Sequence, residues 1–552
     1  MAEHFENLYS SEGSRVVDRK AINSLGLADG ELMQRAGAAA YGVICRRWPG
    51  ISTLNVVCGP GNNGGDGYIL ARLAHQAGIK VRVSQVVPPK TDDAQRALEQ
   101  LDLQSITVEP LNIEKVREAE LVVDAVLGTG LSRPPSDIFK TAIDSINASG
   151  RPVLSLDTPS GLDVDSGWSG GAAVQATVTV TFVCLKAGLF TGHGPDLTGD
   201  IVVECLEVPA TVLAGVEPMA CCISAQIVQE RLPARRRTLH KGEAGHLVVI
   251  GGDVSMKGAP YLAGTAALRT GAGLVTIATR RSHLDTIGLG QPELMCHVVE
   301  DQQSLEAVLA GKTAVVVGPG MGQSEWGAQM LSGVLASGLP GVVDADALNL
   351  LAQEPKQTGQ MILTPHPGEA SRLLNMDVDA IQSQRFVSAA KIQSQYESIC
   401  VLKGAGTVVA TGGGNIWLCK EGNTGMATAG MGDVLAGVIG ALLCQGLDPG
   451  DAATAGVWLH SRAADLAAAD GGERGGLPVG VRRGALLQVL HLALGRTVQA
   501  EEQRRRQGGN GRSDIRPARV WRHRRAHSAV YGRAVEAGSQ EGVGWAGRSP
   551  PS

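Results

Sequence analysis

Short apolar runs rich in β-branched residues alternate with helical stretches along most of this 552-residue chain. Continuous apolar strands separated by helices are typical of a parallel sheet that helices cover on both faces. The first series of runs occupies residues 54–58, 81–87, 121–126 and 153–157, after a helical stretch from about 12 to 47. The pattern therefore predicts an α/β domain in the first part of the chain.

A second series of the same kind follows residue 209. Its strand-like runs are residues 247–250, 274–278, 314–317, 341–343, 361–363 and 398–402, with helical stretches such as 260–270 between them. A chain of this length also exceeds what one hydrophobic core usually supports. We therefore expect two α/β domains, at residues 1–215 and 241–475, joined by a less regular linker at 216–240.

The end of the chain breaks this pattern. Residues 476–552 are rich in Arg, Gly and Ser, and helical periodicity fades after about Gly475. Such a composition buries little apolar surface, so we expect this tail to be disordered. Nucleic-acid binding by the basic tail is a weaker alternative, and a change of reading frame near Gly475 is a third.

The bulk composition argues against several classes of protein. The formal net charge of −5 is small for this length, so no global field draws the chain to nucleic acid or to an anionic membrane. The 10 cysteines show no regular spacing, so neither a zinc site nor a disulfide framework is indicated. No apolar h-region and no long uncharged apolar run occurs. We expect a cytoplasmic protein without a membrane span, and the sequence leaves open whether it forms a homo-oligomer.

A glycine-rich loop, GPGNNGGDG at residues 59–67, follows the first run and leads into a helical stretch that starts at Tyr68. Such a loop allows close backbone approach and directs N–H groups at an anion near a helix N-terminus. It matches neither the Rossmann fingerprint nor the P-loop. A structural turn is the alternative, but the side-chain oxygens of Asn62, Asn63 and Asp66 favour a site for a hard cation or for ribose hydroxyls.

In two other runs of the first series an aspartate directly follows the apolar stretch, which is residues 121–123 in one and 153–156 in the other. Asp124 leads into residues 128–134, and Asp157 leads into residues 159–163. Ligands of open parallel sheets bind outside the carboxyl ends of the strands, so the three polar loops should converge on one crevice. Either aspartate alone could merely cap a helix.

The second series carries a separate set of motifs. The segment AGMGDVLAG at 429–437 joins a glycine turn to an apolar helix, so backbone N–H groups there can stabilise a phosphoryl group in transfer. Asp433 can accept the proton of an attacking hydroxyl or, alternatively, cap the helix. The segment KGAGT at 403–407 supplies a cation, backbone donors and a hydroxyl. His366 lies between two prolines in a stiff loop after a strand. Further loops follow strands at residues 257–260 and 318–322. Each of these three features, taken alone, could be structural.

Together these motifs resemble the bifunctional NAD(P)H-hydrate repair enzymes, over roughly residues 8–475. The stretches GPGNNGGDG, DAVLGTG and DTPSGLD look like the epimerase domain, and the later motifs are similar to the dehydratase domain. The resemblance implies a Rossmann-like three-layer domain followed by a ribokinase-like α/β domain. It also implies that the substrates are NADHX and NADPHX, the hydrated forms of NADH and NADPH.

For the first domain, the resemblance implies a binding site for the hydrated cofactor made of Asn62, Asn63, Gly64, Gly65, Asp66, Gly128, Thr129, Gly130, Leu131, Ser132, Arg133, Pro134 and Asp157. It further implies a potassium ion held by Asn63, Asp124 and Ser160, although oxygen ligands by themselves do not distinguish potassium from sodium or magnesium. We expect Asp157 to be the acid/base residue, with Lys186 as the weaker candidate. Gln34 stands where the family often has an acid.

For the second domain, the resemblance implies that ADP is bound by Lys403, Gly404, Ala405, Gly406, Thr407 and Gly432. The hydrated dinucleotide would be bound by Ala259, Gly322, His366 and Asp433. Asp433 would activate the ring hydroxyl for phosphorylation, and loss of phosphate would restore the dihydronicotinamide. Magnesium would accompany ADP, and Asp344 and Asp346 either help to hold it or are structural.

Three alternatives stay open at this point. A ribokinase-like vitamin kinase fused to a nucleotide-binding module shares the Gly-x-Gly-Asp site, although the NNGGD loop argues against it. An RNA-associated binding protein rests on the basic tail alone. ATP could replace ADP as the phosphoryl donor. We prefer ADP, because the fused arrangement resembles bacterial members of the family.

Overall fold

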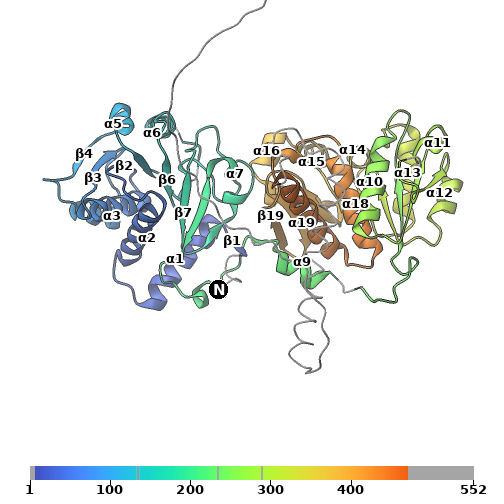
Figure 1. Ribbon diagram of the computed structural model, residues 1–552, viewed down its shortest axis with the longest axis horizontal. Helices are drawn as coiled ribbons and strands as arrows, with labels where there is room; N and C mark the ends of the chain where they lie inside the picture. Colours follow the sequence, from blue (N-terminus) through green and yellow to red (C-terminus); the bar gives the residue numbers. More distant parts are fainter. Residues whose placement is uncertain (1–5, 132, 136, 233–234, 288–289, 470–552) are drawn as a thin grey trace, which may run out of the picture. The chain divides into compact units, whose positions relative to one another are not determined.

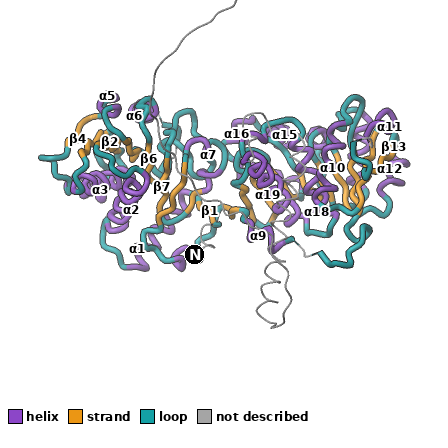
Figure 2. Tube along the Cα trace, in the orientation of Figure 1, coloured by secondary structure: helices purple, strands orange, loops and turns teal. Residues whose placement is uncertain are grey.

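The computed structural model describes residues 6–131, 133–135, 137–232, 235–287 and 290–469, shown in Figures 1 and 2. The predicted tail at 476–552 lies outside these residues. The described chain consists of α-helices and two mainly parallel sheets, which confirms the predicted α/β class.

The first sheet has seven strands in the order β4-β3-β2-β5-β6-β7-β9, and every neighbouring pair is parallel. Its strands are β2 (Thr53–Cys58), β3 (Lys80–Gln85), β4 (Thr107–Pro110), β5 (Leu121–Ala125), β6 (Val153–Leu156), β7 (Val178–Phe182) and β9 (Asp200–Glu204). The strand order reverses between β2 and β5, so the loops after these two strands diverge to opposite faces of the sheet. This reversal is the place where an open α/β sheet binds its ligand.

The helices of the first part are α1 (Ser11–Leu25), α2 (Glu31–Arg47), α3 (Asn62–Gln76), α4 (Asp92–Glu99), α5 (Ile113–Arg117), α6 (Asp137–Asn147), η2 (Ala187–Phe190), α7 (Gly194–Leu197) and α8 (Ala210–Leu213). Helix α3 starts six residues before the predicted start at Tyr68, inside the glycine-rich loop. A Cβ atom on Gly64 would lie 2.1 Å from the carbonyl oxygen of Gly59, so these glycines let the first turn of α3 approach the end of β2.

The second sheet has twelve strands in the order β13-β12-β11-β14-β15-β16-β17-β18-β19-β10-β1-β8. Its main strands are β11 (His246–Ile250), β12 (Leu274–Thr279), β13 (Met295–Val298), β14 (Ala314–Val317), β15 (Gly341–Val343), β16 (Met361–Leu363), β17 (Ile399–Leu402), β18 (Thr407–Gly412) and β19 (Asn415–Cys419). The strands from β13 to β17 are parallel, and β18 is antiparallel to both of its neighbours. The predicted strands of this series are confirmed, whereas β13, β18 and β19 were missed.

Three short strands, β1 (Asn7–Tyr9), β8 (Leu185–Lys186) and β10 (Ala220–Cys222), extend the second sheet from β19. Strand β10 pairs with β19 on one side and β1 on the other, and β1 pairs with β8. The segment 216–240, predicted as a linker, therefore contains a sheet strand and the helix α9 (Ala225–Arg231). Two or three residues are too few to show a strand pattern in the sequence.

The remaining helices are α10 (Gly258–Thr270), η3 (Arg281–His283), α11 (Leu284–Ile287), α12 (Gln302–Leu309), α13 (Glu325–Ala336), α14 (Asp346–Gln353), α15 (Pro367–Leu374), α16 (Val378–Gln382), α17 (Arg385–Tyr396), η4 (Thr424–Met426), α18 (Met431–Cys444) and α19 (Pro449–Ala467). Successive residues of β14 belong to different core clusters: Val316 to the cluster that contains α18, and Val315 to the cluster that contains α13. Helices thus bury both faces of the second sheet, as the continuous apolar runs predicted.

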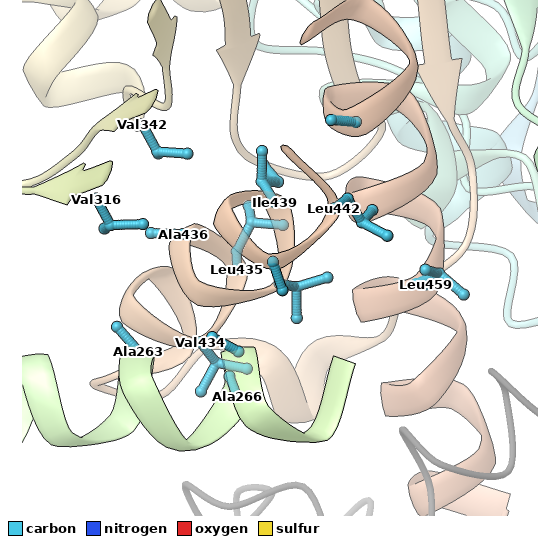
Figure 3. Packing of buried hydrophobic residues seen from close by; sticks show 14 of the residues in the cluster. Ala263, Ala266, Val316, Val342, Val434, Leu435, Ala436, Ile439, Leu442 and Leu459 are labelled. Carbon is cyan, nitrogen blue, oxygen red and sulfur yellow. The ribbon is translucent and has the colours of Figure 1, made fainter. Parts of the chain in front are cut away.

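Helix α18 carries one of the second set of motifs and is buried along most of its length (Figure 3). Val434 and Ala436 lie in one apolar cluster with Ala263 of α10 and Val316 of β14. A Cβ atom on Gly437 would lie 2.1 Å from the carbonyl oxygen of Ala263, so glycine permits the close approach of α18 to α10. This packing fixes the N-terminal turn of α18, which carries Asp433.

Two candidate active sites

A cavity of about 570 Å³ lies at the carboxyl ends of β2 and β5. It is lined by Asn62, Asn63, Asp66, residues 128–131 and Asp157, together with Lys186 and residues of α1 and α2. The three polar loops predicted to converge therefore do so.

Other residues predicted for this site lie around the cavity and do not line it. Gly64 and Gly65 are buried under neighbouring backbone and the Met33 side chain, and Arg133 and Pro134 are exposed. Ser132 lies outside the described residues. Gln34 accepts a hydrogen bond from Arg72 and donates one to Gln100, so it joins helices and does not face the cavity.

Asp157 and Lys186 form a buried ion pair in this cavity. Asp157 has a φ of +63°, a conformation that non-glycine residues seldom adopt and that often marks functional sites. Lys186 also donates hydrogen bonds of 2.9 Å to the hydroxyl of Thr181 and the carbonyl of Phe182. Burial alone would lower the pKa of Lys186, but Asp157, Cys184 and Asp18 together outweigh burial, so the pKa is raised and the ammonium stays charged.

Two further carboxyl groups face the same cavity. Burial and the nearby Asp157 raise the pKa of Asp18 to about 6, although Lys186 opposes this shift. Burial, Asp157 and Asp18 raise the pKa of Asp66 well above its usual range, so Asp66 can donate a proton or a hydrogen bond. Sequence reasoning missed Asp18. The available signal was its place on the buried face of α1, between Ser14, Val17 and Ala21.

A cluster of oxygen atoms lies beside this cavity, where Asp124 is the last residue of β5 that pairs with β6. Its carboxylate accepts hydrogen bonds from the backbone N–H of Ser160, at 2.8 Å, and from the hydroxyls of Ser155 and Ser160. Asn63 donates its amide to the carbonyl of Leu127 at 3.0 Å, while its buried Oδ1 atom has no hydrogen-bond partner among the described residues. The Leu127 carbonyl also lies within hydrogen-bond distance of the Ser160 hydroxyl, which connects Asn63 to Asp124. An unpartnered buried amide oxygen in such a network of oxygen atoms fits a hard cation.

The second set of motifs meets at the carboxyl ends of β15, β16 and β17. Lys403 follows β17, and its ammonium lies 2.8 Å from Asp344, which follows β15, and 3.8 Å from Glu369 of α15. The hydroxyl of Thr364, after β16, donates to Asp344 at 2.7 Å. Gly432 adjoins this group, because a Cβ atom there would lie 3.3 Å from the Lys403 ammonium. A partly buried cation, two carboxyl groups and the N-terminus of α18 are thus brought together.

Asp433 has the titration behaviour expected of a base that works near neutral pH. Burial and the Asp344 carboxylate raise its pKa to about 7, and Lys403 opposes the shift. Glu369 behaves in the same way: burial raises its pKa to about 7 against the effect of Lys403. Perturbed carboxyl groups of this kind cluster at catalytic sites.

His366 caps helix α15. Its Nδ1 atom accepts hydrogen bonds from the backbone N–H groups of Gly368 and Glu369, at 3.0 and 3.4 Å. Burial first, and then Lys403, lower the pKa of His366, so the imidazole is neutral and carries its proton on Nε2. The His366 side chain is half exposed, and its Nε2 atom lies 3.4 Å from a carboxylate oxygen of Glu369.

The loops around Ala259 and Gly322 also lie at this edge of the sheet. A Cβ atom on Gly320 would lie 3.1 Å from the Cβ of Ala259, and the backbone N–H of Gly322 donates to Asp346 at 2.9 Å. Asp346 therefore holds the loop 318–322 in place. Ala345, between Asp344 and Asp346, has a φ of +50°, a strained conformation that often marks functional sites.

Fold and sites define a class: an enzyme with two separate α/β sites, one with a lysine–aspartate pair and one suited to phosphoryl transfer. Residues 29–188 match the family described as YjeF-related protein N-terminus, and residues 247–479 match the family described as NAD(P)H-hydrate dehydratase. These matches confirm the Rossmann-like and the ribokinase-like parts.

The chain is similar to curated proteins over most of their length. It is 44% identical to the bifunctional NAD(P)H-hydrate repair enzyme Nnr of Coxiella burnetii over 471 residues, 85% of this chain and 96% of that protein. It is also 44% identical to the Escherichia coli protein of the same name, over 83% of this chain and 89% of that protein. The chain belongs to the family of bifunctional NAD(P)H-hydrate repair enzymes, and full-length relatives of this kind do not support the vitamin-kinase alternative.

Among solved structures, the chain is similar to the ADP/ATP-dependent NAD(P)H-hydrate dehydratase of Bacillus subtilis. The two are 33% identical with a TM-score of 0.46, and the match covers 49% of this chain and 98% of that one.

Proposed function

We propose that this chain repairs hydrated NADH and NADPH: the first site interconverts the R and S epimers, and the second dehydrates the S epimer at the expense of ADP. The observation that carries the proposal is the presence of two separate clusters of perturbed carboxyl groups, each with a lysine paired to an aspartate, at the carboxyl ends of parallel strands in two sheets.

At the first site, inversion at the hydrated ring carbon needs proton transfer to and from the hydroxyl that departs and returns. Asp157 is the proposed acid/base residue, and its ion pair with Lys186 fixes its carboxylate in the cavity. Residues 62–66 and 128–134 would bind the rest of the hydrated cofactor. Asn63, Asp124 and Ser160 would hold a potassium ion, whose charge would help to orient an anionic substrate.

At the second site, Asp433 is the proposed base for phosphorylation of the ring hydroxyl. The hydroxyl oxygen bonds to the β-phosphorus of ADP as the bond to AMP breaks, and Asp433 accepts the proton. Phosphate then departs from the ring carbon with loss of a proton from its neighbour, which restores the ring double bond. Lys403 to Thr407 and Gly432 would bind ADP, and Ala259, Gly322, His366 and Asp433 the dinucleotide.

Several finer points belong to the same proposal. Magnesium would accompany the nucleotide, and Asp344 either helps to hold it or orients Lys403, with which it is paired. The proposed domain limits are 1–215 and 241–475, and the segment 216–240 between them adds β10 to the second sheet. None of the described helices has the length and apolar character needed to cross a bilayer. All ten cysteines are free thiols, which supports a reducing cytoplasm.

The test supplies purified full-length protein with a mixture of R and S NADH hydrate, ADP and magnesium, and follows NADH absorbance. The wild type should consume both epimers. Asp433→Asn should abolish NADH formation and leave epimer exchange intact, whereas Asp157→Ala should do the reverse. Loss of both reactions in both folded variants would refute one reaction per site.

A further inference from the structure

The loop 403–407 of the second site is held from behind by Arg385, the first residue of α17. Arg385 is 1% exposed. Its guanidinium donates to the carbonyls of Lys403 and Gly406, each at 3.3 Å, and to the hydroxyl of Thr191 at 2.9 Å. Every acceptor that the structure gives Arg385 is neutral, and burial lowers its pKa to about 10, so it remains a buried cation at neutral pH.

Thr191 comes from the other part of the chain, just after the short helix η2. Its hydroxyl accepts from Arg385 and shares its proton between the carbonyls of Ala405 and Gly406, at 3.1 and 3.0 Å. The next residue, Gly192, donates its backbone N–H to Ala405 at 3.2 Å. The segment 190–192 and the loop 403–407 also touch through their backbones, because a Cβ atom on Gly406 would lie 2.1 Å from the carbonyl oxygen of Phe190.

These contacts decide where the amide groups of the loop point. In a trans peptide the N–H of one residue is antiparallel to the C=O of the residue before it. Because Arg385 and Thr191 bind the carbonyls of Lys403 and Ala405, the N–H groups of Gly404 and Gly406 face away from these two side chains, which together form a clamp on the loop. The N–H groups of residues 404–406 donate to no acceptor within the described part of the chain.

We propose that Thr191 and Arg385 are positioning residues for nucleotide binding: together they hold loop 403–407 so that its N–H groups meet the phosphates of a nucleoside diphosphate. A segment of the first part of the chain thereby completes the site of the second. The inference rests on the proposed use of ADP. A free loop would occupy the binding conformation only part of the time, which weakens apparent affinity in proportion.

The structure separates this role from the chemistry at either site. Lys403 is held independently, since its ammonium is paired with Asp344 and its N–H donates to the carbonyl of Pro365. Lys186 is likewise held by Asp157 and Thr181. Loss of the clamp should therefore raise the Kd and KM for ADP and leave both the kcat of dehydration and the epimerase rate near wild type.

The experiment compares Thr191→Val, Thr191→Ser and Arg385→Lys with the wild type in the full-length protein. Thr191→Val removes the hydroxyl at nearly constant volume, and the Kd for ADP by calorimetry and the KM for ADP should rise about tenfold or more. Thr191→Ser retains the hydroxyl and should restore affinity to within about threefold of wild type. Arg385→Lys keeps the positive charge but loses the planar set of guanidinium N–H donors, so it should weaken ADP binding. It provides an independent test if Thr191→Val does not fold.

Thr179→Val is the matched control, because Thr179 is also fully buried and donates its hydroxyl to a backbone carbonyl, that of Thr198 at 2.7 Å. It should leave ADP binding unchanged. The clamp is refuted if folded Thr191→Val and Arg385→Lys bind ADP like the wild type, or if Thr179→Val weakens binding equally. If the wild type binds ADP but does not consume the hydrate, the proposed function fails. The role of Thr191 and Arg385 is still tested in that case, because it is measured by the Kd for ADP of the variants and the wild type.

Discussion

The Lys403 ammonium lies 2.8 Å from the Asp344 carboxylate, and its charge also lowers the pKa of Asp433. One lysine thus sets the electrostatics of the second site. Replacing it by a neutral residue would leave Asp344 buried and unpaired.

We predict that Lys403→Gln shifts the pH profile of dehydration as well as its rate. Asp433 must be ionised to accept a proton. The positive charge of Lys403 lowers the pKa of Asp433, so its removal should raise that pKa. The acidic limb of kcat/KM should therefore move to higher pH, with a rate loss of about a hundredfold or more at pH 7. The same limb, measured in Arg372→Gln, should stay within a few tenths of a pH unit of wild type.

The pH dependence of the wild-type dehydratase follows from Asp433 itself. With a pKa of about 7, the carboxylate is mostly protonated at pH 6 and mostly ionised at pH 8. We expect kcat/KM for dehydration to rise through this range with a midpoint near pH 7, and Asp433→Asn to lower it by about 10² to 10⁴-fold. A flat profile between pH 5.5 and 8.5 would contradict Asp433 as the base.

Asp18 is predicted to take part in epimerisation. It faces the same cavity as Asp157, and a pKa of about 6 lets it exchange protons near neutral pH. Asp18→Asn should slow epimer exchange by about tenfold or more and leave dehydration of pure S hydrate unchanged. Asp29→Asn, an exposed change at the rim of the cavity, serves as control. Equal effects of the two variants would remove Asp18 from the reaction.

The proposed cation site can be tested by thermal unfolding, without an activity assay. If the unpartnered Oδ1 of Asn63 helps to hold potassium, KCl should raise the thermal midpoint of the protein more than LiCl at equal ionic strength. Asn63→Ala should abolish this difference and slow epimerisation. A difference that persists unchanged in Asn63→Ala would assign the ion to another place.

Gly437 tests the packing that positions Asp433. A Cβ atom there would collide with the carbonyl oxygen of Ala263, so Gly437→Ala should destabilise the protein by about 1–3 kcal/mol in urea unfolding and lower dehydratase activity. Gly42→Ala, also within a helix, would contact only the flexible end of Arg46 and should be neutral or stabilising by up to about 1 kcal/mol. A Gly437→Ala protein as stable as wild type would show that α18 can shift.

Local pattern by itself determined the α/β class and most long buried strands, because β-branched runs such as that of β14 reflect burial on both faces. It also predicted that Asp124, Asp157 and the NNGGD loop would meet, since parallel strands end at one edge of a sheet. Short or half-exposed strands such as β4 and β10 were missed, because their periodicity is too brief to read.

Only the tertiary structure decided which distant side chains share an environment. Nothing in the sequence near Asp18 indicates that it lies in the field of Lys186, and nothing near Thr191 points to Arg385, 194 residues away. Hydrogen bonds and pKa shifts depend on distance and burial in the folded chain. The motifs therefore predicted where the two candidate sites lie, whereas the packing of α1, α17 and α18 determined the charge and shape of these candidates.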